Sequence, residues 1–424
     1  MSARFNAPVS AIRIMSHRAA HRATDRHTHR IIAGLVANAL VGVIASHAAG
    51  AQSLLPSTGW GLTPTLNVWA FPTKLPQGVG DVLAIAEVAV PFRVRANVGR
   101  WRADLSGAAA FGGVAIAAEE GGHLAQLAGP TDVKLRVTGP LFGDANMITL
   151  GVNIPTGKVG LTSEQTSTLQ LLAAPALQMP VATFGMGAGA TVGVIHAFQG
   201  EGWALALGAS GEKRAEYSPV ALVLSAGPSS TQLTPGLAAH VTMGFDKTVG
   251  EGRLSLLVLG DVFTKDRLRF TDVPTDTSSN YTLGPQATLS AQYDMGTSGW
   301  RERTISAAAR KRSAYRNTTG ATVAGSSGTF LEGAINAVRG GPQGAGLVIG
   351  TDARWHSGMP FTDALVGAAV SAIGATIGVE GAGSHTATRF TVHAMYGSFD
   401  TGKTTLNGIN LTLGFSIAAR REAQ

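Results

Sequence analysis

The chain has 424 residues, of which 33 are lysine or arginine and 26 are aspartate or glutamate, giving a formal net charge of +7. It contains no cysteine, which excludes disulfides, thiolate metal sites and a cysteine nucleophile. Charged residues are 14% and hydrophobic residues 45% of the chain, which argues against disorder. The 55 glycines and the low charge are both unusual for a soluble protein of this length.

The first 51 residues have the pattern of a secretory signal peptide. Six arginines and one aspartate precede an uncharged apolar run at 31–46, and the small residues Ala49-Gly50-Ala51 follow it. The run is about 16 residues long, shorter than the ~20 that a membrane-spanning helix needs, although an uncleaved signal anchor is an alternative. Removing 1–51 lowers the net charge from +7 to +2. The remaining chain therefore gives no reason to expect a nucleic-acid partner.

From residue 82 onward, apolar residues recur at every second position. In the last segment Ile409, Leu411 and Leu413 alternate with polar or small residues. This period of two predicts β-strands. The strands are expected at 82–98, 101–117, 131–139, 146–154, 184–198, 202–212, 231–247, 252–268, 281–295, 302–313, 328–338, 345–356, 365–379, 387–398 and 406–418, with a weaker first candidate at 62–71.

Short glycine-containing turns separate some of these segments, and longer polar stretches separate others. The long stretches lie at 118–130, 157–170, 213–230, 269–280 and 314–327. An alternation of short turns and long loops is typical of the two rims of an outer-membrane barrel.

Two architectures fit alternating strands: a soluble sandwich with a dry core, or a transmembrane barrel whose apolar residues face lipid. The segment lengths, the near absence of charge on one face and the export signal favour the barrel. Most of the six tryptophans fall near segment ends, where the aromatic girdles of a barrel belong. The uncharged stretch 364–379 is rich in glycine and β-branched residues and short for a membrane helix, so it too is predicted to be a strand.

We therefore predict an all-β fold, a transmembrane antiparallel up-and-down β-barrel of about 14 strands, within a range of about 12 to 16. The expected organisation is a signal peptide at 1–51, an N-terminal segment at 52–80 in the periplasm or the lumen, and an outer-membrane barrel at 81–424.

Residues 131–198 resemble a known group of outer-membrane proteins. The run Thr131-Asp-Val-Lys-Leu-Arg-Val137 is followed by a strand ending in Ile154-Pro-Thr-Gly157, and then by the glycine-rich Gly185-Met-Gly-Ala-Gly-Ala-Thr-Val192. This pattern resembles proteins of the phenol meta-pathway type, which are similar to long-chain fatty acid transporter barrels. The resemblance implies passive uptake of small hydrophobic or aromatic molecules across the outer membrane.

The polar faces of the predicted strands supply the candidate lumen-lining residues. Basic residues on three neighbouring strands could form a positive wall facing a solute, or the charges could pair across strands and merely fill a polar interior. The candidates are Glu87, Arg93, Arg95, Arg102, Asp104, Lys134, Arg136, Asp352, Arg354, His356, Arg389 and His393.

Catalysis is not expected, because no nucleophile, metal-binding or nucleotide-binding motif lies in a suitable context. No metal or cofactor is predicted, and His356 and His393 are considered only as possible neighbours of Asp352 or Asp261. The favoured function is a channel or facilitator with lipid, a small solute and the outer-membrane assembly machinery as partners. The alternatives are a non-transport surface barrel for adhesion or support, and a soluble secreted β-protein.

Overall fold

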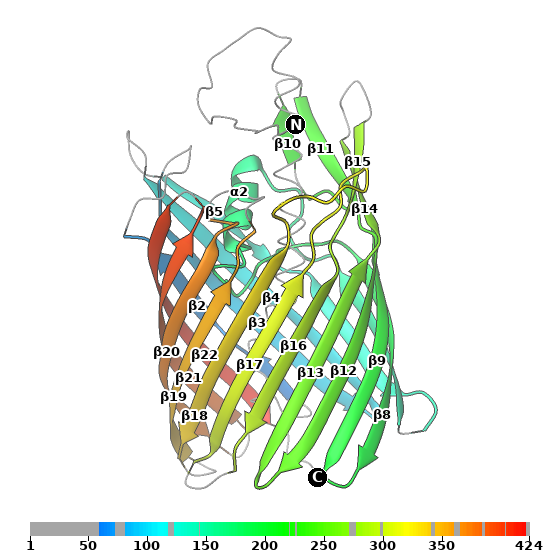
Figure 1. Cartoon of the computed structure of the whole chain (residues 1–424), viewed down its shortest axis with the longest axis vertical. Coiled ribbons are helices and arrows are strands. Elements are labelled where there is room, and N and C mark those ends of the chain that lie inside the picture. Colours follow the sequence, from blue (N-terminus) through cyan, green and yellow to red (C-terminus); the bar gives the residue numbers. More distant parts are fainter. Residues whose placement is uncertain are drawn as a thin grey trace, which may run out of the picture.

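The computed structural model describes residues 59–420 except 73–80, 118–122, 144, 220, 225–226, 271–276, 297–299, 341–343, 360–364, 384–385 and 403. The predicted signal peptide at 1–51 lies outside the described residues. Figure 1 shows a barrel of tilted strands with further strands extending above one rim. Among the described residues, no helix is long and apolar enough to cross a membrane.

The wall is a closed antiparallel barrel with 16 strand positions. Two of these positions are each filled by two consecutive short strands, β1 (Gly59–Leu62) with β2 (Thr65–Ala70), and β5 (His123–Pro130) with β6 (Val133–Pro140). The other positions are β3 (Asp81–Val98), β4 (Trp101–Ala117), β7 (Asn146–Ile154), β8 (Gly189–Gly200), β9 (Trp203–Arg214), β12 (Leu237–Val249), β13 (Gly252–Phe263), β16 (Gln286–Asp294), β17 (Glu302–Arg312), β18 (Gly328–Arg339), β19 (Gly344–His356), β20 (Ala369–Ala382), β21 (Thr386–Asp400) and β22 (Thr405–Arg420). The fold prediction is confirmed.

The barrel closes between its first and last strands. β1 and β2 pair with β22 on one side and with β3 on the other, all antiparallel. The expectation that 52–80 forms a segment outside the wall is therefore wrong for 59–70. Closure satisfies the backbone hydrogen bonds of every strand, as a structure surrounded by lipid requires.

Side chains alternate between the lumen and the outer surface. Lipid-side positions carry large apolar residues that remain 40–60% exposed, such as Leu150, Leu289 and Ile377. Strand 365–379 of the prediction is observed as β20, with Ile373 and Ile377 outward and Gly374 and Gly378 inward. Trp60, Trp101 and Trp203 lie near the starts of their strands on the outer face, where a girdle is expected.

One rim has tight turns and the other has long connections. Gly99 (φ 60°) and Gly250 (φ 61°) adopt left-handed backbone conformations in two-residue hairpins, a conformation that glycine reaches without strain. At the opposite rim, two stretches predicted as loops contain strands of a second sheet. This upper sheet has the order β10 (Ala221–Leu224), β11 (Gly227–Thr234), β14 (Lys265–Phe270) and β15 (Thr277–Thr282), and it stands above the barrel in Figure 1.

Candidate functional site

The connection between β7 and β8, residues 155–188, folds into the barrel instead of extending from its rim. We call it the inward loop. It contains the one helix described, α2 (Ser163–Leu172), which the sequence did not predict and which packs against β3, β4 and β5. Thr162 and Gln165 cap its start with reciprocal hydrogen bonds of 3.3 Å. At its end, Leu172 occupies the space left by Gly112 on the inner face of β4.

Asp132 holds both ends of the inward loop. This residue is buried in the bulge between β5 and β6. One extra residue there switches the lumen-facing side chains from odd-numbered positions in β5 to even-numbered positions in β6. Its carboxylate accepts hydrogen bonds from the N–H of Gly157 at 2.9 Å, the N–H of Met186 at 2.7 Å and the amide of Asn153 at 2.8 Å. The three sequence segments that carry the family resemblance therefore meet at one carboxylate.

The middle of the inward loop is bonded to two walls of the barrel. Trp69 Nε1 donates to the carbonyl of Leu177 at 3.0 Å, and Val181 N–H donates to the fully buried Glu87 carboxylate at 3.1 Å. From the other side, Arg354 Nη1 donates to Gln178 Oε1 at 2.5 Å. Trp69 is therefore not one of the tryptophans that form a girdle, because its side chain is completely buried inside the barrel.

Below the inward loop lies a luminal cavity of about 750 Å³, with Leu177 and Gln178 in its roof. Its lining combines small polar residues with apolar ones. The polar group includes Thr65, Asn67, Ser306, Asn336 and Thr412, and the apolar group includes Leu177, Val338, Val348 and Met395. A cavity of this size and mixed lining is typical of sites for small organic molecules.

The candidate basic wall exists on β3, β4 and β6, but it is partly neutralised. Arg93 and Arg95 both form ion pairs with Asp104 at 2.9 Å. Arg102, Lys134 and Arg136 also occupy inward positions, and no ion pair is found for them among the described residues. Cross-strand pairing is thus observed for Arg93 and Arg95, and a positive wall that faces a solute stays a prediction.

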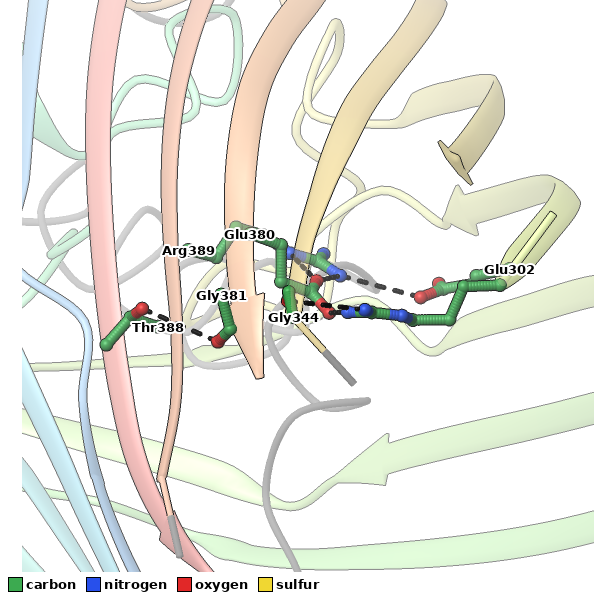
Figure 2. Close-up of polar contacts among 7 residues, drawn as sticks. Glu302, Gly344, Glu380, Gly381, Thr388 and Arg389 are labelled. Atoms are coloured by element: carbon green, nitrogen blue, oxygen red, sulfur yellow. Dashed lines mark hydrogen bonds and ion pairs between the residues drawn. The ribbon is translucent and has the colours of Figure 1, made fainter. Parts of the chain in front are cut away.

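A network of charged side chains connects several neighbouring strands of the wall near the rim with the short turns (Figure 2). The Glu380 carboxylate binds Arg389 on the neighbouring strand at 2.5 Å and Arg301 at 2.6 Å. Arg301 precedes β17, so its side chain passes β18 and β19 to reach β20. Arg389 also lies 3.5 Å from Glu302, which Figure 2 shows on the far side of the cluster. Glu302 and Arg389 line the luminal cavity.

Two histidine–aspartate pairs face the lumen. His393 Nε2 lies 2.8 Å from Asp352 Oδ1, which is one of the pairings named from the sequence. His240 Nδ1 lies 2.6 Å from Asp261 Oδ1. His356 is separate from these pairs: it is buried next to the ring of Phe330 and close to the carbonyl of Ala368. No group of three or more potential metal ligands occurs in the part of the chain that the structure describes.

A smaller cavity of about 40 Å³ lies at the upper rim, between the barrel and the upper sheet. Burial raises the pKa of Tyr217 to about 12 and raises the pKa of Asp266 above its usual range. Asp266 accepts a hydrogen bond from the N–H of Gly236 at 2.5 Å, which holds the base of the upper sheet against β12.

Sequence reasoning missed Asp132, Trp69, Gln178 and Glu380. Glu380 carried a usable signal, because it lies on the inner parity directly opposite Arg389, just beyond the uncharged stretch 364–379. Gln178 carried none, since its role depends on a loop whose path the alternation of residues does not determine.

The closed wall, the apolar exterior and the polar interior define a β-barrel of the outer membrane. No protein-family model matches the chain, and no curated protein sequence matches it. Among solved structures, a mutant of the TodX monoaromatic hydrocarbon channel is similar at 7% identity and a TM-score of 0.40, over 87% of this chain and 91% of that one.

The CymD monoaromatic hydrocarbon channel is similar at 9% identity and a TM-score of 0.37, over 89% of this chain and 92% of that one. The outer-membrane protein opdK from Pseudomonas aeruginosa is similar at 9% identity and a TM-score of 0.39, over 86% and 100%. These likenesses are weak, so the fold assignment rests on the strand pairing and the apolar exterior of this chain itself.

Proposed function

We propose that the protein is an outer-membrane channel or facilitator for passive movement of small organic solutes. The luminal cavity of about 750 Å³ carries this proposal, because it lies inside a closed wall and is roofed by a loop of the same chain. The strands of the wall pair with one another and do not need the inward loop to complete their backbone hydrogen bonds. The loop can therefore set the width of the pathway through the lumen.

Small hydrophobic or aromatic molecules are the solute class that we propose. The apolar side chains of Val338, Val348 and Met395 in the cavity support this choice, as does the resemblance of residues 131–198 to proteins of the phenol meta-pathway type. The remaining proposed partners are the lipid that contacts the exterior and the machinery that assembles barrels. The proposal assigns no catalytic residue.

Conductance in planar lipid bilayers tests the channel. We expect discrete steps for the folded wild-type protein, and larger or noisier steps for Asp132→Ala, because this change removes the carboxylate that ties both ends of the inward loop. Asp400→Ala is the matched control, since Asp400 lies at the same rim and bonds only within its own turn, to Gly402 N–H, among the described residues. A folded, heat-modifiable protein that never conducts or takes up solute would support a surface role instead.

A further inference from the structure

Arg354 carries a buried charge that forms no ion pair among the described residues, although the carboxylates of Asp352 and Glu332 lie near enough to act on it through space. Only 9% of the residue is exposed, and its Nε and Nη2 atoms have no hydrogen-bond partner among the described residues. Its single hydrogen bond goes to the neutral side chain of Gln178. By contrast, the luminal Arg95 and Arg389 are both paired with carboxylates. Unpaired buried donors of a charged group are costly, so a partner for Arg354 would be strongly favoured.

The direction of the side chain explains why Glu332 is not that partner. Glu332 is directly opposite Arg354 in the pairing of β18 with β19, but no hydrogen bond or ion pair joins the two described side chains. The guanidinium instead lies 5.4 Å from the ring centroid of Trp69, on the other side of β20–β22. The positions between them on the inner face are small, namely Ala372, Gly397 and Gly408. The ring of Trp69 lies over Gly397 and Gly408, 3.3 Å and 3.2 Å from where a Cβ atom on each would stand, and this is how it reaches toward Arg354.

The two unpaired donors have the geometry that a carboxylate requires. Nε and Nη2 lie on one edge of the planar guanidinium and point in nearly parallel directions, which suits bidentate binding of two carboxylate oxygens. The Trp69 ring lies against the guanidinium, and the apolar side chains of Leu177 and Met395 line the same cavity as Arg354. An organic acid with a flat apolar body matches both features, whereas a hydrated inorganic anion matches only the charge.

We propose that Arg354 binds the carboxylate of a small aromatic acid at the top of the luminal cavity, an assignment that rests on the proposed channel function. Both free donors are now covered by the protein, so binding requires the guanidinium to rotate from Trp69 toward the cavity. The cavity of about 750 Å³ holds a single-ring acid with room to spare. Rotation also releases Gln178, whose backbone φ of 51° is unusual for a residue other than glycine. Ligand binding thereby loosens one attachment of the inward loop.

A fluorescence titration of the folded full-length protein with benzoate tests the assignment. We expect benzoate to change the emission of Trp69, a response that Trp69→Phe abolishes while the other five tryptophans remain. Benzyl alcohol, which has the same ring without the charge, should bind much more weakly. Arg354→Met should weaken benzoate binding by about ten- to a hundredfold, the loss expected for hydrogen bonds to a charged group.

Three further variants separate this site from general luminal electrostatics. Arg354→Lys keeps the charge but not the fork, and should recover only part of the affinity. Arg253→Met removes a positive charge that faces the lumen at the opposite rim, paired with Asp246, and should bind benzoate like the wild type. Glu332→Gln should bind benzoate more tightly, because it removes a nearby negative charge. Unchanged affinity in Arg354→Met, or an equal loss in Arg253→Met, would overturn the proposal.

Bilayer recordings distinguish failure of this site from failure of the channel. If the wild-type protein conducts but benzoate neither binds nor reduces the current, the carboxylate site is wrong and the channel stands. If benzoate binds at Arg354 but neither current nor solute uptake is measured, the site stands as a binding site and the proposed transport function is wrong. Heat-modifiable migration on a gel confirms that each variant is folded.

Discussion

Individual small residues decide where the larger side chains of the lumen can lie. A Cβ atom on Gly157 would lie 2.0 Å from the carbonyl oxygen of Phe184, so the two ends of the inward loop can approach only because this position is glycine. Asp132 then bonds to backbone N–H groups that this close approach brings together. The Asp132 carboxylate and the missing Cβ of Gly157 therefore both hold together the two ends of the inward loop.

Gly157→Ala is expected to detach the inward loop without unfolding the barrel. The added methyl group meets the backbone of Phe184 and Gly185 as well as the Asp132 carboxylate, so a side-chain rotation alone cannot make room for it. We expect a cost of about 1–3 kcal/mol, as for other overpacked sites. Limited proteolysis should show faster cleavage within 155–188, while heat-modifiable migration stays the same. Gly244→Ala is the control, because a Cβ at Gly244 meets nothing within 4 Å. Equal cleavage rates in the two variants would contradict this explanation.

At the scale of elements, hydrogen bonds at strand ends attach the upper sheet and the inward loop to a wall that is complete without them. β14 continues directly from β13 after one residue, and β11 runs into β12. The Asp266 carboxylate links these two junctions by accepting the N–H of Gly236. Because this carboxyl is buried, its pKa is raised, and its ionised form is disfavoured in the folded upper sheet.

The stability of the upper sheet is therefore expected to fall as the pH rises. A carboxyl whose folded pKa is raised binds its proton more tightly in the folded state, so its contribution is complete below the usual pKa of about 4 and is lost as the pH rises through the raised value. Amide exchange of β11 and β14, corrected for intrinsic rates, should show greater protection at pH 4 than at pH 7. Asp266→Asn should remove most of this difference. The same pH dependence in the variant would show that another group is responsible.

For the whole molecule, stability depends on closing the barrel through its first strand position. β1 and β2 are short, but they cover the edges of both β3 and β22. Without them, two long strands would present unpaired backbone groups to lipid, where each such group costs several kcal/mol.

Deletion of residues 59–70 is expected to abolish the folded, heat-modifiable form on a gel. The control is deletion of 317–321, an exposed turn at the rim with the long connections that contributes no strand to the wall. The control should fold and migrate as the wild type does. A heat-modifiable product from the first deletion would show that β3 and β22 can close the barrel directly.

The alternation of residues was enough to predict the wall, most strand positions and the direction of the charged side chains. Arg93, Asp104, Asp352 and Arg389 all face the lumen, as expected from their parity. A period of two is a local property, because neighbouring side chains on a strand must point to opposite faces. Because one face of the wall contacts lipid and the other contacts water, this alternation appears in the sequence as apolar residues at every second position.

Only the tertiary structure decided what happens inside the wall. The inward path of 155–188, the burial of Trp69 and the placement of Arg354 beside it depend on contacts between residues more than a hundred positions apart. The sequence of a loop or an isolated tryptophan does not specify such partners, because closing the barrel brings them together. The sequence by itself thus determined a lipid-facing barrel, and the closed structure decided how its lumen is filled.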